Sequence, residues 1–392
     1  MSHPFLKSLL VLSSLLLVTA CSTITEIQTS VSERVFGREP ADPPEPLEEI
    51  KATASSKLLW SAKIGEAGNY EFTPVVDAGF AYATSNEGEI VKLDVNNGQQ
   101  LWRVKTGESL SGGVGVGGSL VMVGTQQGVI YAYDLNGKLQ WKSRLSSEVL
   151  SAPKYYDGTV IVRTGDSRIF GINANDGSRK WVYGRTSPSL SLRSSAGVVV
   201  DSGAVYAGFA GGKLIAVRAD NGKVLWEASV AQPKGVTEIE RIADITSQPV
   251  IDGPLVYAVA YQGRIAAVDR VSGRVVWNRD ISSLSGLSAE EGRIYVSHAI
   301  GSVYSLDYTT GKTFWRQAAL KNRQLSAPVP LGSWVVVGDL EGYVHALGRD
   351  DGAQAARIRV GESPIMPQLA LVNSNTVLAQ SREGGIYAIQ IK

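Results

Sequence analysis

The sequence predicts an all-β protein built as an eight-bladed β-propeller, with four antiparallel strands in each blade. Three observations lead to this prediction. A strand–turn–strand pattern recurs along the chain, and the Trp that ends most copies returns about every 42 residues. Outside the first residues the periodicity is that of strands. One copy of the repeat is divided between the two ends of the chain.

The repeat is clearest over residues 263–277, GRIAAVDRVSGRVVW. Alternating apolar residues give the first strand, Asp269 and Gly273 favour a turn, and the β-branched run before Trp277 begins the next strand. Further copies span residues 88–102, 128–141, 167–181, 212–226 and 301–315. A seventh copy, 342–356, has Ala356 in the Trp position, and an eighth, 384–392, contains the first strand alone.

The missing half of the eighth copy is found near the other end of the chain. Leu58-Leu59-Trp60 has the character of the Trp-bearing strand, and no first half precedes it. We therefore expect the C-terminal strand to pair with the strand around Trp60. This pairing would close the ring and leave no open end in the array of blades.

The other half of each repeat lies upstream of the initial Gly and contains two more strands around a turn, as in residues 74–82 and 249–259. We name the four strands of a blade A to D in chain order, and D carries the Trp. The Gly-rich run 112–118 is predicted to be a small-residue strand A near the centre of the ring, because no helix signal follows it as a phosphate loop would require. The propeller is predicted to span residues 58–392.

The recurring Trp and Asp residues are interpreted as structural. A Trp in seven of eight blades suits packing between neighbouring sheets better than a ligand-stacking platform. The recurring Asp is interpreted as a turn former, because Asn173, Arg218 and Gly348 replace it in other copies.

The N-terminal residues have the pattern of a secretion signal. Lys7 precedes an apolar run of about ten residues, which is short for a membrane span. Residues 1–20 are therefore predicted to be a signal peptide. Cys21, the single cysteine, follows small residues as in a bacterial lipobox, and it is predicted to be acylated after cleavage. Residues 21–57, with a Pro-rich stretch at 43–46, are predicted to form a flexible tether.

Composition argues against several classes of function. The formal net charge of +1 gives no overall field for nucleic acid. After the predicted signal peptide the chain contains only His298 and His345, both in strand-like runs, and no cysteine pair. Thiol catalysis and zinc clusters therefore lack ligands, and we predict no catalytic residues, no metal site and no cofactor.

Two connections between strand D and the next strand A are longer than the others, and they follow Trp181 and Trp226. In an up-and-down blade these connections lie on the same face of the ring, here on adjacent blades. They contain apolar residues beside charged ones, which is typical of a protein interface. The candidate partner-binding residues are Leu190, Leu192, Arg193, Arg241 and Asp244, with Ile242 as a further apolar candidate. The alternative is that the leucines fold inward and anchor the loops.

The repeat resembles the PQQ-type β-propeller family. Together with the lipobox, the tether and the ring closure, it resembles in particular the lipoproteins of the outer-membrane β-barrel assembly machinery. Ser22 after the cysteine matches their sorting to the outer membrane, on its periplasmic side. The resemblance implies a monomeric scaffold that docks on a periplasmic POTRA domain of the barrel protein BamA. Through BamA it joins the BAM complex, and unfolded outer-membrane proteins are further candidate partners. Leu190, Leu192, Arg193 and Asp244 match the docking segments, whereas Thr246 stands where those relatives have a second Asp.

Two alternatives differ in class. A quinone-dependent dehydrogenase shares this repeat, and it would need bound cofactor and a carboxylate cluster for a metal in the central channel. A glycan-binding module would need exposed aromatic residues grouped on one face, whereas Tyr and Trp fall mostly at strand positions.

Overall fold

The structure is a computed structural model that describes residues 42–392. The predicted signal peptide and Cys21 lie outside the described residues, as does most of the predicted tether. The chain divides into two units, Met1–Pro44 and Glu45–Lys392, and the second unit forms the propeller. Residues 42–392 contain strands, turns and loops, and no helix there has the length and apolar character needed to cross a bilayer.

Each of the first four blades takes four consecutive strands. Blade one contains β2 (Val75–Asp77), β3 (Phe80–Thr84), β4 (Glu89–Asp94) and β5 (Gln100–Lys105). Blade two contains β6 (Leu110–Gly117), β7 (Leu120–Thr125), β8 (Val129–Asp134) and β9 (Leu139–Arg144). Blade three contains β10 (Lys154–Tyr156), β11 (Thr159–Thr164), β12 (Arg168–Asn173) and β13 (Arg179–Gly184). Blade four contains β14 (Val198–Asp201), β15 (Ala204–Phe209), β16 (Lys213–Arg218) and β17 (Val224–Ser229).

The remaining blades continue the series, and the last combines strands from both ends. Blade five contains β18 (Val250–Asp252), β19 (Leu255–Val259), β20 (Ile265–Asp269) and β21 (Val275–Arg279). Blade six contains β22 (Gly286–Glu290), β23 (Arg293–Ser297), β24 (Val303–Asp307) and β25 (Thr313–Gln317). Blade seven contains β26 (Val329–Leu331), β27 (Trp334–Gly338), β28 (Tyr343–Gly348) and β29 (Gln354–Arg359). Blade eight contains β30 (Ala370–Asn373), β31 (Thr376–Gln380), β32 (Gly385–Ile391) and β1 (Ser56–Lys63).

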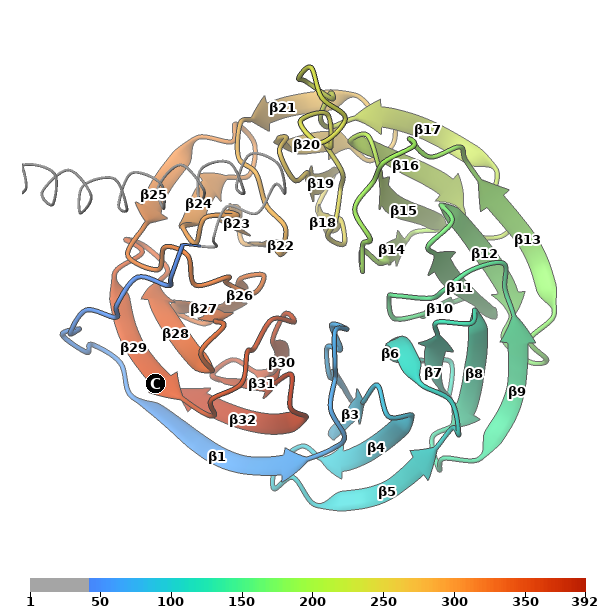
Figure 1. The fold of residues 1–392 in the computed structure, drawn as a ribbon, viewed down its shortest axis with the longest axis horizontal. Coiled ribbons are helices and arrows are strands. Elements are labelled where there is room, and N and C mark those ends of the chain that lie inside the picture. The colour runs from blue at the N-terminus through green and yellow to red at the C-terminus, as the bar shows by residue number, and fades with distance from the viewer. Residues whose placement is uncertain (1–41) are drawn as a thin grey trace, which may run out of the picture. The chain divides into compact units, whose positions relative to one another are not determined.

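The eight sheets stand around a central opening, with strand A innermost and strand D on the rim (Figure 1). The Gly-rich run is indeed an inner strand, β6. The predicted closure is confirmed, because β32 pairs antiparallel with β1 and places Ala388 opposite Trp60. We call the side of the ring that carries the connections from strand D to the next strand A the loop face.

A β-bulge lies just before the Trp position in every blade. Lys92 pairs with Trp102 and Leu93 pairs with Gln100, so Leu101 is an extra residue on its strand. The same register shift occurs in the other blades, and in blade eight it lies between β1 and β32. A bulge leaves one residue unpaired, and the apolar residues in this position that are exposed on the rim are Leu59, Leu101, Leu225, Val276 and Phe314.

The tryptophans join neighbouring blades, as predicted. The indole Nε1 of Trp277 donates to the backbone oxygen of Tyr308 in blade six at 2.9 Å, and its ring lies against Gly311. Gly311 has a φ of +68°, and a Cβ there would approach the ring within 2.6 Å. The same hydrogen bond and the same Gly contact recur for the other six repeat tryptophans.

The turns between strands C and D confirm the interpretation of the recurring Asp. In blade five, Asp269 Oδ1 accepts hydrogen bonds from the backbone of Ser272 and Val271. Asp94, Asp134 and Asp307 make equivalent bonds in their own turns. These hydrogen bonds fix the backbone of the turn, so the carboxylates serve the fold.

The boundary between blades seven and eight is built differently. Blade eight has no turn between strands C and D, because β32 and β1 come from opposite ends of the chain, and blade seven has Ala356 in the Trp position. The backbone of Thr53 and Ala54 donates to the oxygen of Ala355 at this boundary. Residues 45–55, which we call the strap, thus cover the seam that lacks a Trp (Figure 1). The propeller unit therefore begins before residue 58, within the segment expected to be tether.

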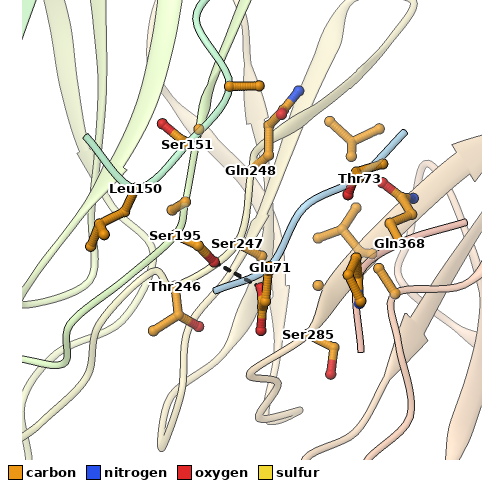
Figure 2. Close-up of a pocket in the computed structure, with 18 of the residues that line it drawn as sticks. Glu71, Thr73, Leu150, Ser151, Ser195, Thr246, Ser247, Gln248, Ser285 and Gln368 are labelled. Atoms are coloured by element: carbon orange, nitrogen blue, oxygen red, sulfur yellow. Dashed lines mark hydrogen bonds between the residues drawn. The ribbon is translucent and has the colours of Figure 1, made fainter. Parts of the chain in front are cut away.

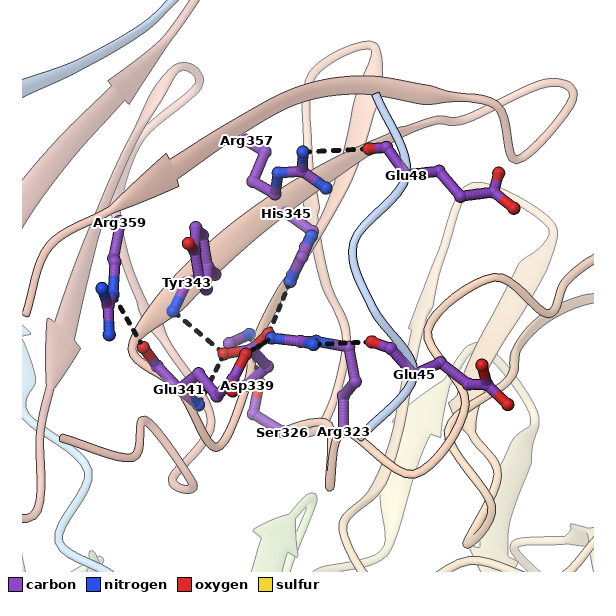
Figure 3. Close-up of polar contacts among 11 residues, drawn as sticks. Glu45, Glu48, Arg323, Ser326, Asp339, Glu341, Tyr343, His345, Arg357 and Arg359 are labelled. Carbon is purple, nitrogen blue, oxygen red and sulfur yellow. Dashed lines mark hydrogen bonds and ion pairs between the residues drawn. The ribbon is translucent and has the colours of Figure 1, made fainter. Parts of the chain in front are cut away.

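A buried ionic network holds the beginning of the strap to blade seven (Figure 3). Arg323 and Asp339 are almost fully buried, and Arg323 Nε lies 2.7 Å from Asp339 Oδ2. Arg323 also pairs with Glu341 and donates to the Glu45 backbone oxygen at 2.9 Å. The same Asp339 oxygen lies 2.9 Å from Nε2 of His345. These contacts satisfy an arginine that would otherwise be costly to bury.

Candidate functional site: paired loops on the loop face

Two neighbouring loops form the candidate docking surface. Loop 1, residues 185–197, connects β13 to β14, and loop 2, residues 230–249, connects β17 to β18. Both are longer than the other connections between strand D and the next strand A. They start from adjacent blades on the same side of the ring, as the strand order requires, and hydrogen bonds join their bases.

Asp244 is the side chain that joins the two loops. Its Oδ2 accepts a hydrogen bond from the backbone N–H of Leu192 at 2.7 Å, and its Oδ1 accepts one from Gly211 at 2.9 Å. Only 3% of Asp244 is exposed. The sequence predicts a charged residue at the rim of the surface, whereas the structure buries this carboxylate beneath it. The reason is that two backbone donors on neighbouring segments need an acceptor.

The other candidates on loop 1 lie at the surface. Leu190 is 42% exposed, and Leu192 is partly buried beside Asp244. Arg193 is exposed but already paired, because its Nη2 lies 2.7 Å from Glu148 Oε2 and its Nε bonds the same carboxylate. Its guanidinium also lies over the ring of Tyr70 at 5.2 Å. The hydrogen bonds that Arg193 donates to Glu148 and Tyr70 raise its pKa.

The candidates on loop 2 differ from one another in exposure. Arg241 is exposed, with Nη1 at 3.9 Å from Glu238, and Ile242 is partly buried. Thr246 is buried, and its hydroxyl donates to the backbone oxygen of Leu284 at 3.1 Å. A hydroxyl can donate this bond and an ionised carboxylate cannot. Thr246, which stands where the related proteins have a second Asp, therefore helps to pack the loop.

Loop 2 also presents apolar residues that the sequence reading missed. Val236 is 95% exposed and Ile239 is 66% exposed. In the same turn, Thr237 and Glu240 exchange hydrogen bonds: Glu240 N–H donates to Thr237 Oγ1, and Thr237 N–H donates to Glu240 Oε2. We call residues 236–241 the capped turn. The T-x-x-E pattern of a capping box was visible in the sequence and could have revealed it.

A cavity of about 290 Å³ lies between loop 1 and blade three. Leu192, Arg193 and Asp244 line it together with Glu148 and Arg163. Arg163 Nη1 donates to the backbone oxygen of Ala196 at 2.6 Å, and its guanidinium stacks over Phe209. Burial lowers the pKa of Arg163 to about 10. The cavity is thus lined by both acidic side chains, Glu148 and Asp244, and basic ones, Arg163 and Arg193. This mixture of charges does not favour a ligand of one charge.

A second pocket is lined by residues of loops 1 and 2 together with other connections that lead to strand A (Figure 2). Residues from all eight blades line this pocket of about 260 Å³, and most of its side chains are small or uncharged polar ones. Glu71 is the carboxylate in this lining, and it accepts a hydrogen bond from Ser195 Oγ at 2.8 Å. The surrounding blades desolvate Glu71 and raise its pKa, although the hydrogen bond from Ser195 opposes this. Within residues 42–392, no three His, Cys, Asp or Glu side chains are grouped to hold a metal ion.

The fold defines a class of protein: an eight-bladed propeller of the PQQ-repeat type, here with two long loops on adjacent blades. A family profile described as "Outer membrane protein assembly factor BamB" matches residues 86–317 and 299–392. The chain belongs to this family, and its function lies in the assembly of outer-membrane proteins.

Individual relatives agree with this assignment. The chain is 39% identical over 388 residues to the outer membrane protein assembly factor BamB of Nitrosomonas eutropha, covering 97% of this chain and 94% of that protein. The crystal structure of BamB from Moraxella catarrhalis superposes with a TM-score of 0.78 at 28% identity, covering 86% of this chain and 100% of that one. The quinohemoprotein alcohol dehydrogenase of Comamonas testosteroni, at 14% identity and a TM-score of 0.68, shares the fold alone, covering 86% of this chain and 76% of that one.

Proposed function

We propose that this chain is a non-enzymatic scaffold lipoprotein of the outer-membrane β-barrel assembly machinery. It acts by holding BamA, through a POTRA domain, on the surface formed by loops 1 and 2. Acylated Cys21 attaches it to the outer membrane on the periplasmic side. The family assignment supports an assembly role, and the paired loops are the observation that supports this docking surface.

The argument for docking starts from the regularity of the ring. The other blades show that short connections are enough to join strand D to strand A. Loops 1 and 2 are longer, and Asp244 holds them together as one surface. Leu190 and Arg241 lie exposed on that surface, which suits an apolar anchor with a charged rim.

Co-purification of BamA with the full chain from detergent-solubilised envelopes tests this proposal. We expect Leu190→Ser together with Arg241→Glu to reduce the recovery of BamA at least tenfold, with an unchanged melting temperature. Neither side chain supports a strand, so the ring should remain folded. Wild-type recovery of BamA by this folded variant would refute the docking surface.

Testing Arg193 needs a double variant, because Arg193→Glu alone would place the new carboxylate next to Glu148 and so disturb loop 1 itself. The double variant Arg193→Glu/Glu148→Arg restores an ion pair of reversed polarity. If Arg193 meets an acidic surface on BamA, the double variant should bind as poorly as the single one. Recovery of binding in the double variant would show that Arg193 acts through the order of loop 1.

The anchor is tested separately by fractionation. Cys21→Ser should release the protein from the outer membrane or leave it unprocessed. Retention in the outer-membrane fraction in high salt, at the wild-type level, would contradict attachment through this cysteine.

A further inference from the structure

We infer that the capped turn, residues 236–241, is a second apolar anchor that enters a groove on the protein bound at the loop face. The inference rests on the proposed function and adds two contact residues to it, Val236 and Ile239. It is carried by their exposure, by the rigidity of the turn, and by the attachment of loop 2 to loop 1.

The exposure of these two side chains has no structural explanation within the ring. Val236 is the most exposed of the large apolar residues in the described chain, and Ile239 lies three positions later in the same turn. Exposed apolar residues on the rim, such as Leu101, follow from the bulges in strand D. Val236 and Ile239 belong to a loop that the repeat does not require, so a neighbouring strand is not the cause of their outward position. Paired apolar residues at a loop tip are typical of contact sites.

The turn that carries them is closed by its own hydrogen bonds. Glu240 Oε2 accepts hydrogen bonds from the backbone of Val236 at 2.8 Å and of Thr237 at 3.0 Å. The Arg241 N–H closes one helical turn on the Thr237 oxygen at 3.2 Å. Gly235 adopts a φ of +125°, and a Cβ there would lie 2.4 Å from the Cβ of Glu240. A rigid tip loses little conformational entropy on binding, so its apolar contacts contribute more to affinity.

The base of loop 2 connects the turn to the surface already proposed. Ala243 and Ile245 are buried in the core of blades four and five, and the Ile245 N–H donates to Phe209. Between them, Asp244 accepts from Leu192 of loop 1. The capped turn and Leu190 therefore stand on one fixed base, and a single partner can contact both.

The charges around the turn favour a protein over a membrane as the occupant. Glu238 and Glu240 flank the apolar residues, and Glu238 lies 3.9 Å from Arg241. Lys234 and Arg241 balance these two charges, so the turn has no excess positive charge to attract anionic lipid headgroups, and its carboxylates are costly to insert into a bilayer. An apolar groove with a polar rim accommodates both the side chains and the carboxylates.

Binding of the purified full chain to BamA in detergent tests the inference. We expect Val236→Ser/Ile239→Ser to weaken binding about 30-fold, the loss typical of a hot spot. Val271→Ser is the matched control, because Val271 is 84% exposed but lies in a C–D turn on the opposite face. This control should bind as the wild type does. Thr237→Ala should weaken binding about fivefold, and Thr237→Ser should restore it by restoring the hydroxyl.

The outcomes separate this inference from the proposed function. If Leu190→Ser/Arg241→Glu abolishes binding while Val236→Ser/Ile239→Ser binds as tightly as the wild type, the inference is wrong and the docking surface stands. If neither variant weakens binding, both are wrong.

A polarity-sensitive fluorophore on Ile239→Cys tests the membrane alternative. The labelled full chain is placed in vesicles of phosphatidylethanolamine and phosphatidylglycerol, with and without BamA. A blue shift only when BamA is present supports the inference, and a blue shift in the vesicles alone overturns it.

Discussion

Asp244→Ala should loosen loop 1 while leaving the ring folded. The substitution removes the acceptor of two backbone N–H groups, those of Leu192 and Gly211, at a place where only 3% of the side chain is exposed. A hydrogen bond to a charged acceptor contributes about 1.5–3 kcal/mol. Because water entering the gap recovers part of the loss, we expect the free energy of opening loop 1 to fall by about 3 kcal/mol.

Hydrogen exchange measures this directly. A loss of about 3 kcal/mol corresponds to roughly 100-fold faster exchange of the Leu192 amide, with little change in the strands. Asp244→Asn keeps one acceptor oxygen and should show a smaller effect. Asp280→Ala removes an exposed carboxylate on the same face, paired with Arg264 at 2.6 Å, and should leave exchange in loop 1 unchanged.

The same variants decide how Asp244 acts on binding. If it positions loop 1, BamA affinity and Leu192 protection should fall together in Asp244→Ala, and both should fall less in Asp244→Asn. Wild-type protection of Leu192 in Asp244→Ala would refute the reasoning, and loss of BamA binding in that protected variant would mean that the carboxylate contacts the partner.

Four further predictions concern the ring. Trp277→Ala should lower the free energy of unfolding by about 3–5 kcal/mol in urea, because it removes a buried ring and its bond to Tyr308; an effect below about 1 kcal/mol would contradict packing between blades. Gly311→Ala should cost about 2 kcal/mol more than Gly107→Ala, since both have positive φ but only Gly311 faces an indole; equal costs would show that backbone strain alone matters. Deleting residues 385–392 removes the strand between β31 and β1, and it should destabilise the whole ring by more than about 4 kcal/mol; an unchanged melting temperature would rule out closure. Burial lowers the pKa of His345 below its usual 6.5, despite the nearby Asp339, so the unfolded chain takes up a proton that the folded chain does not. The free energy of unfolding should therefore decrease from pH 7 to pH 5. His345→Gln should make this decrease smaller, and an identical decrease in the variant would exclude His345 as its source.

The architecture could be predicted from the sequence because each copy of the repeat contains the signals for all the strands and turns of one blade. Alternating strands, the turn residues Asp269 and Gly273, and a Trp at a fixed distance all describe one blade. The division of the last copy around Trp60 then requires closure. These features depend on backbone preference and side-chain alternation among residues close in sequence, so they can be recognised without knowing the fold.

The site was predicted less completely, because its contacts join residues far apart in sequence. The pairing of Arg193 with Glu148 and the bonds of Asp244 to Leu192 and Gly211 depend on how separate connections meet in space. A charged residue in a loop is predicted to be exposed, because the sequence does not show which backbone N–H groups will surround it in the fold. The rim bulges were not predicted, because simple alternation along a strand does not show where an extra residue such as Leu101 is inserted.

The closure of blade eight by strands from the two ends of the chain has a consequence for folding. Hairpins within the first seven blades join residues close in sequence, whereas the pairing of β1 with β32 brings Trp60 to Ala388. The Arg357–Glu48 hydrogen bond of the strap spans 309 positions. Contacts between distant residues carry the largest loop-closure entropy, so we expect the pairing of β1 with β32 to be the last step in forming the ring.

Until that step the growing array has two open sheet edges, and such edges are templates for pairing with other chains. We therefore expect the greatest aggregation risk in the interval before β1 pairs with β32. The strap shortens this exposure once closure begins, because the same segment that leads into β1 also covers the edge of blade seven.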